Sequence, residues 1–203
     1  MFGDAAVTSA KQALLNRNAL LPYHYSQHVE ASLTGSPVFR GVFFDFPTDA
    51  CVGAVDEQFM FGPGLFVAPV LHQGATSVNT YLPTSSYFYD YYSGGLVKSS
   101  PSCSSPVTLP AALSAPAPLL IVGGKVIISQ DPQTTTRATR QGDYHIHVAL
   151  SSLHEASSTL YIDDGEGLNT LGGKEYSQVD FEFSNNTLVS KAQLTNYKGE
   201  VRY

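Results

Sequence analysis

Two apolar runs, residues 38–46 and 65–71, constrain the fold more than any other part of this sequence. In the first run both alternating sets of residues are apolar, with phenylalanines on both sides. A strand with one solvent-exposed face alternates apolar with polar residues, so the pattern predicts a strand covered on both faces. The second run predicts another strand, with Pro69 where no ladder hydrogen bond is needed. Gly62-Pro63-Gly64 between the runs predicts a tight turn, because glycine tolerates unusual backbone angles and proline fixes φ.

Composition favours a β-rich, acidic protein. The chain has 203 residues, which fits one β-rich domain or two small ones. Its 11 Lys and Arg against 17 Asp and Glu give a formal net charge of −6, which argues against a nucleic-acid-binding surface. Only 14% of residues are charged, while Tyr, Ser, Thr, Gly and Pro are abundant, and this balance favours strands and turns over long helices.

No segment predicts a membrane partner. The most apolar region, residues 119–128, is interrupted by Gly123-Gly124-Lys125 and is too short to span a bilayer. The first twelve residues, MFGDAAVTSAKQ, have no apolar core of the kind that a signal peptide needs. The residues themselves leave the cellular location unknown.

Two features depend on the compartment. Cys51 and Cys103 are the two cysteines, and they can pair in an oxidising environment or remain free thiols; the sequence leaves both states open. Asn185-Asn186-Thr187 is an N-glycosylation sequon with Asn185 as its candidate acceptor, which matters only in a secreted chain.

Residues 9–33 predict a helix with Thr8 or Ser9 as the N-cap. Pro22 should kink or divide this helix, and Gly35 followed by Pro37 should end it. The apolar stripe predicted to face the core consists of Leu14, Leu21, Tyr25, Val29 and Leu33.

Two histidine pairs have spacings that could suit metal ligands. His24 and His28 are four residues apart, which suits one helix face, but Tyr25 stands where a metalloprotease motif needs glutamate. His145 and His147 share one face of a predicted strand and have no third ligand nearby in the sequence. Partly buried or interfacial imidazoles are the better interpretation of the first pair, and surface exposure of the second; no metal or cofactor is predicted.

The remaining chain predicts short strands. They cover residues 78–82, 87–92, 119–122, 125–128, 144–150, 176–183 and 187–194, with a long loop at 93–118 and a linker at 131–143. Gly123-Gly124 and Asn185-Asn186 each predict a hairpin turn. The aromatic run at residues 87–92 favours a packed sheet face over a sugar-stacking platform.

Asp163, Asp164 and Glu166 place three carboxylates within four residues. A retaining glycosidase needs two carboxyls about 5 Å apart on separate elements, which neighbours on one turn do not provide. An EF-hand loop needs glutamate at its twelfth position, where this sequence has Lys174. A solvated turn is therefore the preferred interpretation.

An ordered set of short motifs resembles glycoside hydrolase family 31, the retaining α-glucosidases and maltases. The motifs are Leu20-Leu21-Pro22-Tyr23, Thr34-Gly35, Phe43-Phe44-Asp45-Phe46-Pro47, Asp56-x-Gln58-Phe59, Ala68-Pro69-Val70, Gly74-Ala75-Thr76-Ser77-Val78, Phe88-Tyr89-Asp90-Tyr91-Tyr92, Gly123-Gly124 and Asp163-Asp164-Gly165-Glu166. They span nearly the whole chain and correspond to the family's region after the catalytic barrel. The resemblance implies that residues 9–33 are the last helix of a (β/α)₈ barrel.

The resemblance also implies where chemistry is missing. The family's nucleophile lies in a Trp-x-Asp-Met-Asn motif, but this sequence has no tryptophan and neither of its methionines follows an aspartate. The family's acid/base residue lies upstream of everything that matches. No catalytic or substrate-binding residue is therefore assigned, and the chain is expected to be inactive alone.

The fold class expected is mainly β: an N-terminal helix, an antiparallel β-sandwich and a second, partial β unit. The expected domains are residues 1–35, 36–136 and 137–203. The expected role is support of a catalytic barrel in a parent α-glucosidase, which alone would meet α-glucan substrate. A free-standing carbohydrate-binding module using tyrosines and the 163–166 acids is the alternative, and an independent enzyme is the third interpretation. The resemblance suggests a lysosomal, secretory or extracellular location.

Overall fold

Two helices lead into the β-structure in this computed structural model, which describes residues 3–197 and 199. Helix α1 covers Asp4–Ala19 and α2 covers Leu21–Thr34, with Pro22 in the first turn of α2. The predicted division at Pro22 is confirmed, because proline fits the first turn of a helix but not its interior. Gly35 ends α2 in the left-handed conformation (φ 76°), as predicted. The predicted N-cap is wrong: α1 begins one turn earlier, after Gly3.

The predicted apolar stripe is not the buried face of the helices. Leu14 and Leu33 are 62% and 65% exposed, and no residue of α1 is buried. Helix α2 instead buries Pro22, Tyr23 and Ser26. Two hydrogen-bonding side chains thus set the face of α2 that packs on the strands, a preference that hydrophobic spacing does not reveal.

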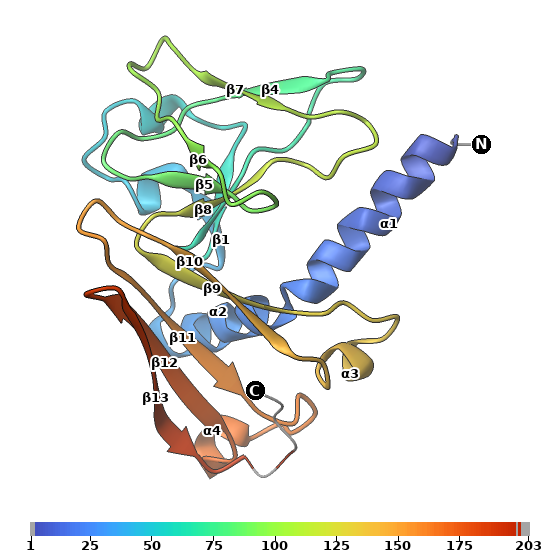
Figure 1. Ribbon diagram of the computed structural model, residues 1–203, viewed down its shortest axis with the longest axis vertical. Helices are drawn as coiled ribbons and strands as arrows, with labels where there is room; N and C mark the ends of the chain where they lie inside the picture. Colours follow the sequence, from blue (N-terminus) through green and yellow to red (C-terminus); the bar gives the residue numbers. More distant parts are fainter. Residues whose placement is uncertain (1–2, 198, 200–203) are drawn as a thin grey trace.

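The strands form three sheets, mostly antiparallel, as predicted for a mainly β chain (Figure 1). The six-stranded sheet has the order β1 (Phe39–Gly41), β2 (Phe59–Phe61), β3 (Leu65–Val67), β8 (Leu119–Val122), β5 (Phe88–Asp90), β6 (Leu96–Val97). A two-stranded sheet pairs β4 (Ser77–Thr80) with β7 (Val107–Pro110). The five-stranded sheet has the order β10 (Tyr144–Ala149), β9 (Lys125–Gln130), β11 (Ala156–Ile162), β12 (Ser177–Ser184), β13 (Thr187–Thr195).

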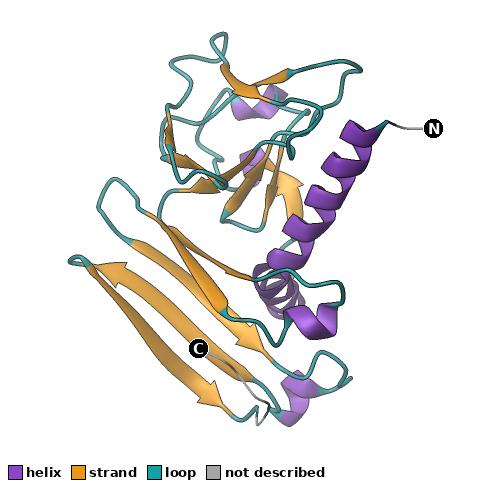
Figure 2. Ribbon diagram, turned by 45° about the vertical axis from the view of Figure 1, so that its right-hand side comes forward, coloured by secondary structure: helices purple, strands orange, loops and turns teal. Residues whose placement is uncertain are grey.

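Three apolar cores hold these layers together. The first lies between the six-stranded sheet and β4–β7 and is centred on Met60, Phe66 and Phe88. The second lies on the other face of that sheet, where Tyr23 of α2 meets Ile121 and Ile127. The third lines one face of the five-stranded sheet. Figure 2 shows the strands in two groups with α2 between them, so this helix is the layer that both groups share.

The first apolar run forms less strand than predicted. Only Phe39–Gly41 is β, and Val42–Phe44 is a 3₁₀ turn. The turn directs Val42 and Phe46 into the core but leaves Phe43 and Phe44 more than half exposed, so the predicted burial on both faces is wrong. The second run agrees better: β3 is buried, Pro69 lies outside it, and Gly62 (φ 56°) forms the predicted turn.

Segments predicted to be loops contain additional strands and short helices. The predicted loop at 93–118 contains β6 and β7, and the predicted linker at 131–143 contains the short helix α3 (Thr136–Thr139). A second short helix, α4 (Thr170–Gly173), precedes β12, while η2 (Val52–Ala54) is a 3₁₀ turn. The β12–β13 hairpin is confirmed, with both turn residues Asn185 and Asn186 at positive φ.

Gly123-Gly124 is not a hairpin turn, so that prediction is wrong. Strand β8 belongs to the six-stranded sheet and β9 to the five-stranded sheet, and the two glycines connect them. The change of sheet therefore occurs here, about a dozen residues before the expected division at residue 136. Gly124 has φ 89°, but Gly123 is glycine for a different reason: a Cβ there would lie 2.8 Å from the carbonyl oxygen of Leu150.

We expect Gly123→Ala to lower the free energy of unfolding by about 1–3 kcal/mol, because added volume in a tightly packed place forces its neighbours to shift. Thermal unfolding followed by circular dichroism measures the change. Gly53→Ala is the matched control, since a Cβ at Gly53 meets no atom within 4 Å. Equal melting temperatures for the two variants would contradict the close approach described here.

Within the described residues, no helix has the length and apolar character needed to cross a bilayer.

Candidate binding site

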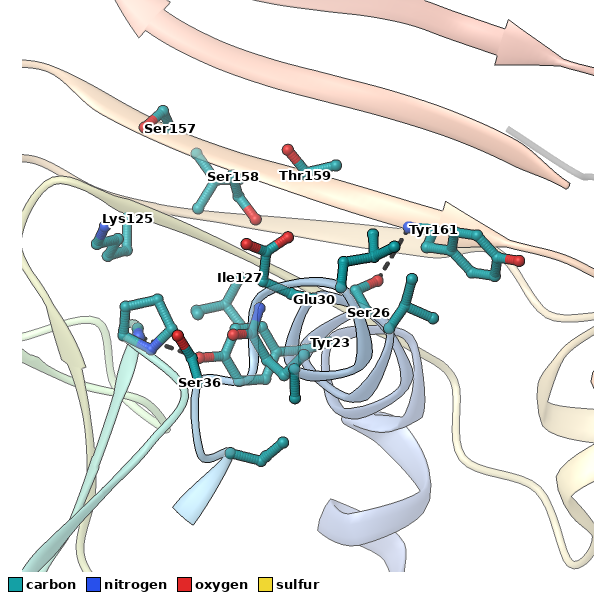
Figure 3. A pocket seen from close by; sticks show the side chains of 18 of the residues that line it. Tyr23, Ser26, Glu30, Ser36, Lys125, Ile127, Ser157, Ser158, Thr159 and Tyr161 are labelled. Carbon is teal, nitrogen blue, oxygen red and sulfur yellow. Dashed lines mark hydrogen bonds between the residues drawn. The ribbon is translucent and has the colours of Figure 1, made fainter. Parts of the chain in front are cut away.

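A cleft of about 410 Å³ opens between α2 and the five-stranded sheet (Figure 3). One hydrogen bond fixes α2 against the sheet: the Tyr161 amide donates to Ser26 Oγ at 2.9 Å, and Ser26 Oγ donates to the Pro22 carbonyl at 2.8 Å. Ser26 is buried, so this link is shielded from water. It sets the distance between the helix and β11 along the cleft.

A second anchor holds α2 against the six-stranded sheet. Tyr23 Oη donates to the Phe61 carbonyl at 2.7 Å and accepts from the Gly64 amide at 3.0 Å. Burial raises the pKa of Tyr23 well above its ordinary value, so the phenol stays protonated and keeps donating. The two anchors therefore hold α2 against both sheets that border the cleft.

Polar side chains from three strands and α2 line the cleft. Lys125 and Ser157 are opposite each other in the parallel β9–β11 pair and therefore share a face of the sheet. Gln178 pairs with Tyr161, which places it on this same face. Gln27 and Glu30 come from α2, and Figure 3 shows Glu30 between the helix and β11. Among the described residues, none of these five side chains has a protein hydrogen-bond or ion-pair partner.

Arg40 also lines the cleft, but its guanidinium is already hydrogen-bonded within the protein. Its guanidinium donates to both carboxylate oxygens of Asp45, at 2.7 and 2.6 Å, and to the Pro37 carbonyl. The pair is about four-fifths buried or more, and it stacks loosely on Phe44 at 5.7 Å. Arg40 therefore shapes the entrance and contributes little free charge.

The carboxylates of the acidic turn, residues 163–166, do not converge on one site: one is buried and two are exposed. Asp163 is 1% exposed, so the prediction of a solvated turn is wrong for this residue; it accepts from Tyr25 Oη at 2.8 Å and from the Gly165 amide at 2.8 Å. Arg140 donates to the carbonyls of Asp163 and Asp164. Asp164 and Glu166 are exposed, as predicted. Amides of residues 166 and 167 bind Asp164 and lower the pKa of its carboxyl.

The histidines of α2 contact each other without further ligands. His24 and His28 lie with their Nε2 atoms 2.9 Å apart, and His24 packs edge-on against Phe61. Burial lowers the pKa of His24, and so does the charge of the adjacent His28. Throughout residues 3–197 no three His, Cys, Asp or Glu side chains converge as a metal site. His24 is partly buried, as interpreted from the sequence, whereas His28 is exposed.

The second histidine pair is divided between two contacts. His145 is exposed and lies 2.9 Å from Asp131, as expected of a surface residue. His147 is instead partly buried, 2.9 Å from Ser129 Oγ, so surface exposure is wrong for it. Burial lowers the pKa of His147. Ser129 is itself only 4% exposed, so this contact lies at the edge of the protein interior.

Cys51 and Cys103 form a disulfide with their Cα atoms 5.2 Å apart, which resolves the alternative left open by the sequence. The bond joins Cys51, directly before the 3₁₀ turn η2, to the loop before β7. Asn185 lies in the exposed turn between β12 and β13, so its amide is accessible. Its glycosylation stays a prediction.

Three phenylalanines form an exposed face near the start of the six-stranded sheet. Phe39, Phe43 and Phe44 are 54%, 53% and 52% exposed. Phe39 stacks on Phe61 with ring centroids 4.7 Å apart and also touches His24. We call Phe39, Phe43 and Phe44 the phenylalanine face. Phe43 and Phe44 contact each other with ring centroids 6.2 Å apart. Exposed apolar side chains gathered in one segment are candidates for a contact surface.

Sequence reasoning assigned no binding residues and missed the cleft. The signal was present only in β11, where polar residues at 157 and 159 precede the buried Tyr161 on one face. The partners on α2 and β9 come from distant segments, and no local pattern connects them.

The sequence of this chain is similar to a known family profile and to known α-glucosidases. Residues 35–127 match the profile described as the glycosyl hydrolase family 31 C-terminal domain. A probable α-glucosidase from Oryza sativa is 36% identical over 181 residues, covering 88% of this chain and 20% of the relative. The lysosomal α-glucosidase of Rattus norvegicus is 34% identical over 215 residues, covering 99% and 23%.

Solved structures give the same result. The glucosidase II α subunit superposes with a TM-score of 0.85 at 30% identity, covering 98% of this chain and 21% of that one. A Flavobacterium johnsoniae dextranase of the family has the same TM-score at 24% identity, which supports the fold alone. The chain spans about a fifth of the length of these relatives. It therefore belongs to glycosyl hydrolase family 31 and contains the C-terminal domain of that family.

Proposed function

We propose that this chain acts as a non-catalytic C-terminal portion of an α-glucosidase-like glycoside hydrolase. In this role it supports a catalytic barrel, and α-glucosides are substrates only of the parent enzyme. Helix α1 would be the last barrel helix, and the sheets would be a proximal β-sandwich and a distal β unit joined at Gly123-Gly124. The observation that carries the proposal is the exposed phenylalanine face, and α1, which buries no residue of its own, is a second exposed surface.

The energetics favour a partner on this surface. Burying a large apolar side chain is worth about 1.5–3 kcal/mol, so three half-exposed phenylalanines represent a substantial unused contribution. A barrel packed against α1 and the phenylalanine face would recover it. The disulfide and the accessible Asn185 favour an oxidising, secretory location for the assembly.

A free-standing carbohydrate-binding module remains the alternative function. The sequence suggests that such a module would use the acids at 163–166, but Asp163 is occupied by Tyr25 and Gly165. An independent enzyme is the least supported, because the three acidic residues do not face one another across a cleft.

A chimera tests the support role. This chain would replace the matching region of the Aspergillus niger α-glucosidase, to which it is 34% identical over 192 residues. We expect the chimera to hydrolyse maltose, while the isolated chain shows no hydrolysis above buffer. Phe43→Ser with Phe44→Ser should destabilise the chimera by about 2–4 kcal/mol, because the exposed rings are buried only there, and should barely affect the isolated chain.

Leu153→Ser is the matched control, since Leu153 is 75% exposed on a loop of the five-stranded sheet. It should leave both proteins unchanged. A folded chimera without activity, or one indifferent to the phenylalanine variant, would count against the proposed support. Hydrolysis by the isolated chain that disappears in Asp163→Ala with Asp164→Ala would instead reveal an active site of its own.

A further inference from the structure

We propose that the cleft between α2 and the five-stranded sheet is a non-catalytic binding site for an uncharged oligosaccharide. This inference does not depend on the support of a barrel. Its basis is the group of five unpartnered polar side chains: Gln27, Glu30, Lys125, Ser157 and Gln178. Groups that can donate and groups that can accept hydrogen bonds are both present, which suits hydroxyls, since each hydroxyl does both.

The charge pattern points to a neutral ligand. Lys125 lies on the sheet and Glu30 on the opposing helix, and no ion pair joins them. A bound anion would meet the Glu30 carboxylate, and a bound cation would meet the Lys125 ammonium. A sugar hydroxyl can donate a hydrogen bond to the Glu30 carboxylate and accept one from the Lys125 ammonium. Hydrogen bonds to charged groups are stronger than those between neutral groups.

The size and lining of the cleft fit a short saccharide. Its volume of about 410 Å³ lies in the usual range for small-molecule sites, roughly 300–1,000 Å³. Val29, Leu33 and Pro37 supply aliphatic surface on which the C–H faces of a sugar ring can pack. Tyr23 and Tyr161 also line the cleft, but their hydroxyls are engaged in other hydrogen bonds.

The site is already formed in the unliganded chain. Ser26 and Tyr23 anchor α2 on both sides, so the helix does not have to move to assemble the walls. Lys125 and Ser157 are fixed by strand register. A site that is organised before binding loses less free energy in ordering its groups.

Other clusters fit a ligand less well. The smaller cavity beside Tyr25, about 260 Å³, is lined by Arg140, Asp163 and Gln130, each of which already has a protein partner. The histidine pair of α2 lacks a third ligand among the described residues. In the cleft, by contrast, five polar side chains converge that have no partner among the described residues.

Titration of the isotope-labelled full chain with maltotriose, followed by amide NMR, tests the proposal. We expect weak binding, with a dissociation constant of about 1 mM. The shifts should be centred on Glu30, Lys125 and Ser157. Lys125→Met with Glu30→Gln keeps side-chain size and should weaken binding about tenfold or more.

The control pair is Lys98→Met with Glu57→Gln, which removes the same charges at exposed positions outside the cleft and should leave the affinity unchanged. Permethylated maltotriose, which has lost its hydroxyl donors, should not bind. Shifts centred elsewhere, equal affinity in both variant pairs, or no shifts at about ten times the expected dissociation constant would each overturn the proposal. The cleft variants should leave maltose hydrolysis by the chimera unchanged, so failure of one proposal is distinguishable from failure of the other.

Discussion

Replacing Cys51 and Cys103 together by alanine should lower the free energy of unfolding by about 4 kcal/mol. The disulfide closes a loop with a sequence separation of 52. Removing the bond raises the conformational entropy of the unfolded chain, and this gain grows with the length of the loop. For a chain of this size the loss corresponds to a fall of about 10 °C in melting temperature. Thermal unfolding measured with and without reductant provides the number.

Reductant supplies an internal control for this prediction. The wild-type chain should lose stability when the bond is reduced, whereas the double alanine variant should not respond. If the variant still responds, reductant acts on something other than Cys51 and Cys103. If reduction leaves the wild-type melting temperature unchanged, the bond does not constrain the unfolded chain in solution.

The chain should also lose stability steeply as pH rises above about 10. Burial is the main cause that raises the pKa of seven tyrosines above the ordinary value. They are Tyr23, Tyr25, Tyr81, Tyr89, Tyr91, Tyr92 and Tyr161. A group with a raised folded-state pKa stabilises the fold below its unfolded pKa and loses this contribution as pH rises through the folded value. Tyrosines in the unfolded chain ionise near pH 10, so they favour unfolding from there upward.

Tyr92 offers a defined window for the measurement. Burial raises the pKa of Tyr92 to about 12, so its contribution should disappear between about pH 10 and 12. Denaturant unfolding at several pH values should give a shallower alkaline slope for Tyr92→Phe than for wild type. Tyr87→Phe is the control: its ring is as exposed as that of Tyr92 (44% against 43%), but among the described residues its hydroxyl has no hydrogen-bond partner, whereas the Tyr92 hydroxyl donates to the Ala117 carbonyl. This variant should leave the slope unchanged. Equal alkaline slopes for Tyr92→Phe and wild type would contradict the contribution assigned to the Tyr92 hydroxyl.

Local signals predicted the elements that depend on local chemistry. Pro22 divides the helices because its ring is tolerated only in a first turn, and Gly35 ends α2 because it adopts a positive φ without steric cost. Asn185-Asn186 turns the β12–β13 hairpin for the same backbone reason. Each of these rules acts within a few residues, so the printed sequence is enough to apply it.

Pairings over long distances were less accessible. The sequence at Gly123-Gly124 looks like a hairpin, since two apolar runs flank two glycines, yet β8 and β9 find different partners. Here the close approach of the Leu150 carbonyl excludes a side chain, and that contact comes from a distant segment. The buried face of α2 was missed for a related reason: Tyr23 and Ser26 are buried by their hydrogen bonds to remote backbone atoms.

The candidate cleft depends most strongly on contacts between residues that are far apart in the sequence. Glu30, Lys125 and Gln178 are separated by up to about 150 positions and become neighbours only through sheet register and the placement of α2. Motif-based reasoning looks for residues that are close in sequence, and it was drawn to Asp163 and Asp164 instead. Of this acidic turn, the structure uses Asp163 to hold Tyr25.

The direct passage from β8 into β9 ties the folding of the two groups of strands together. Ile121 and Ile127 lie on either side of the two glycines and share one core with Tyr23. If the five-stranded sheet opened alone, Ile127 would leave that core, and the six-stranded sheet would lose part of its cover. Proteolysis or truncation near residue 136 would therefore not release a self-sufficient proximal unit, because it would leave β9 attached but without its neighbours β10 and β11.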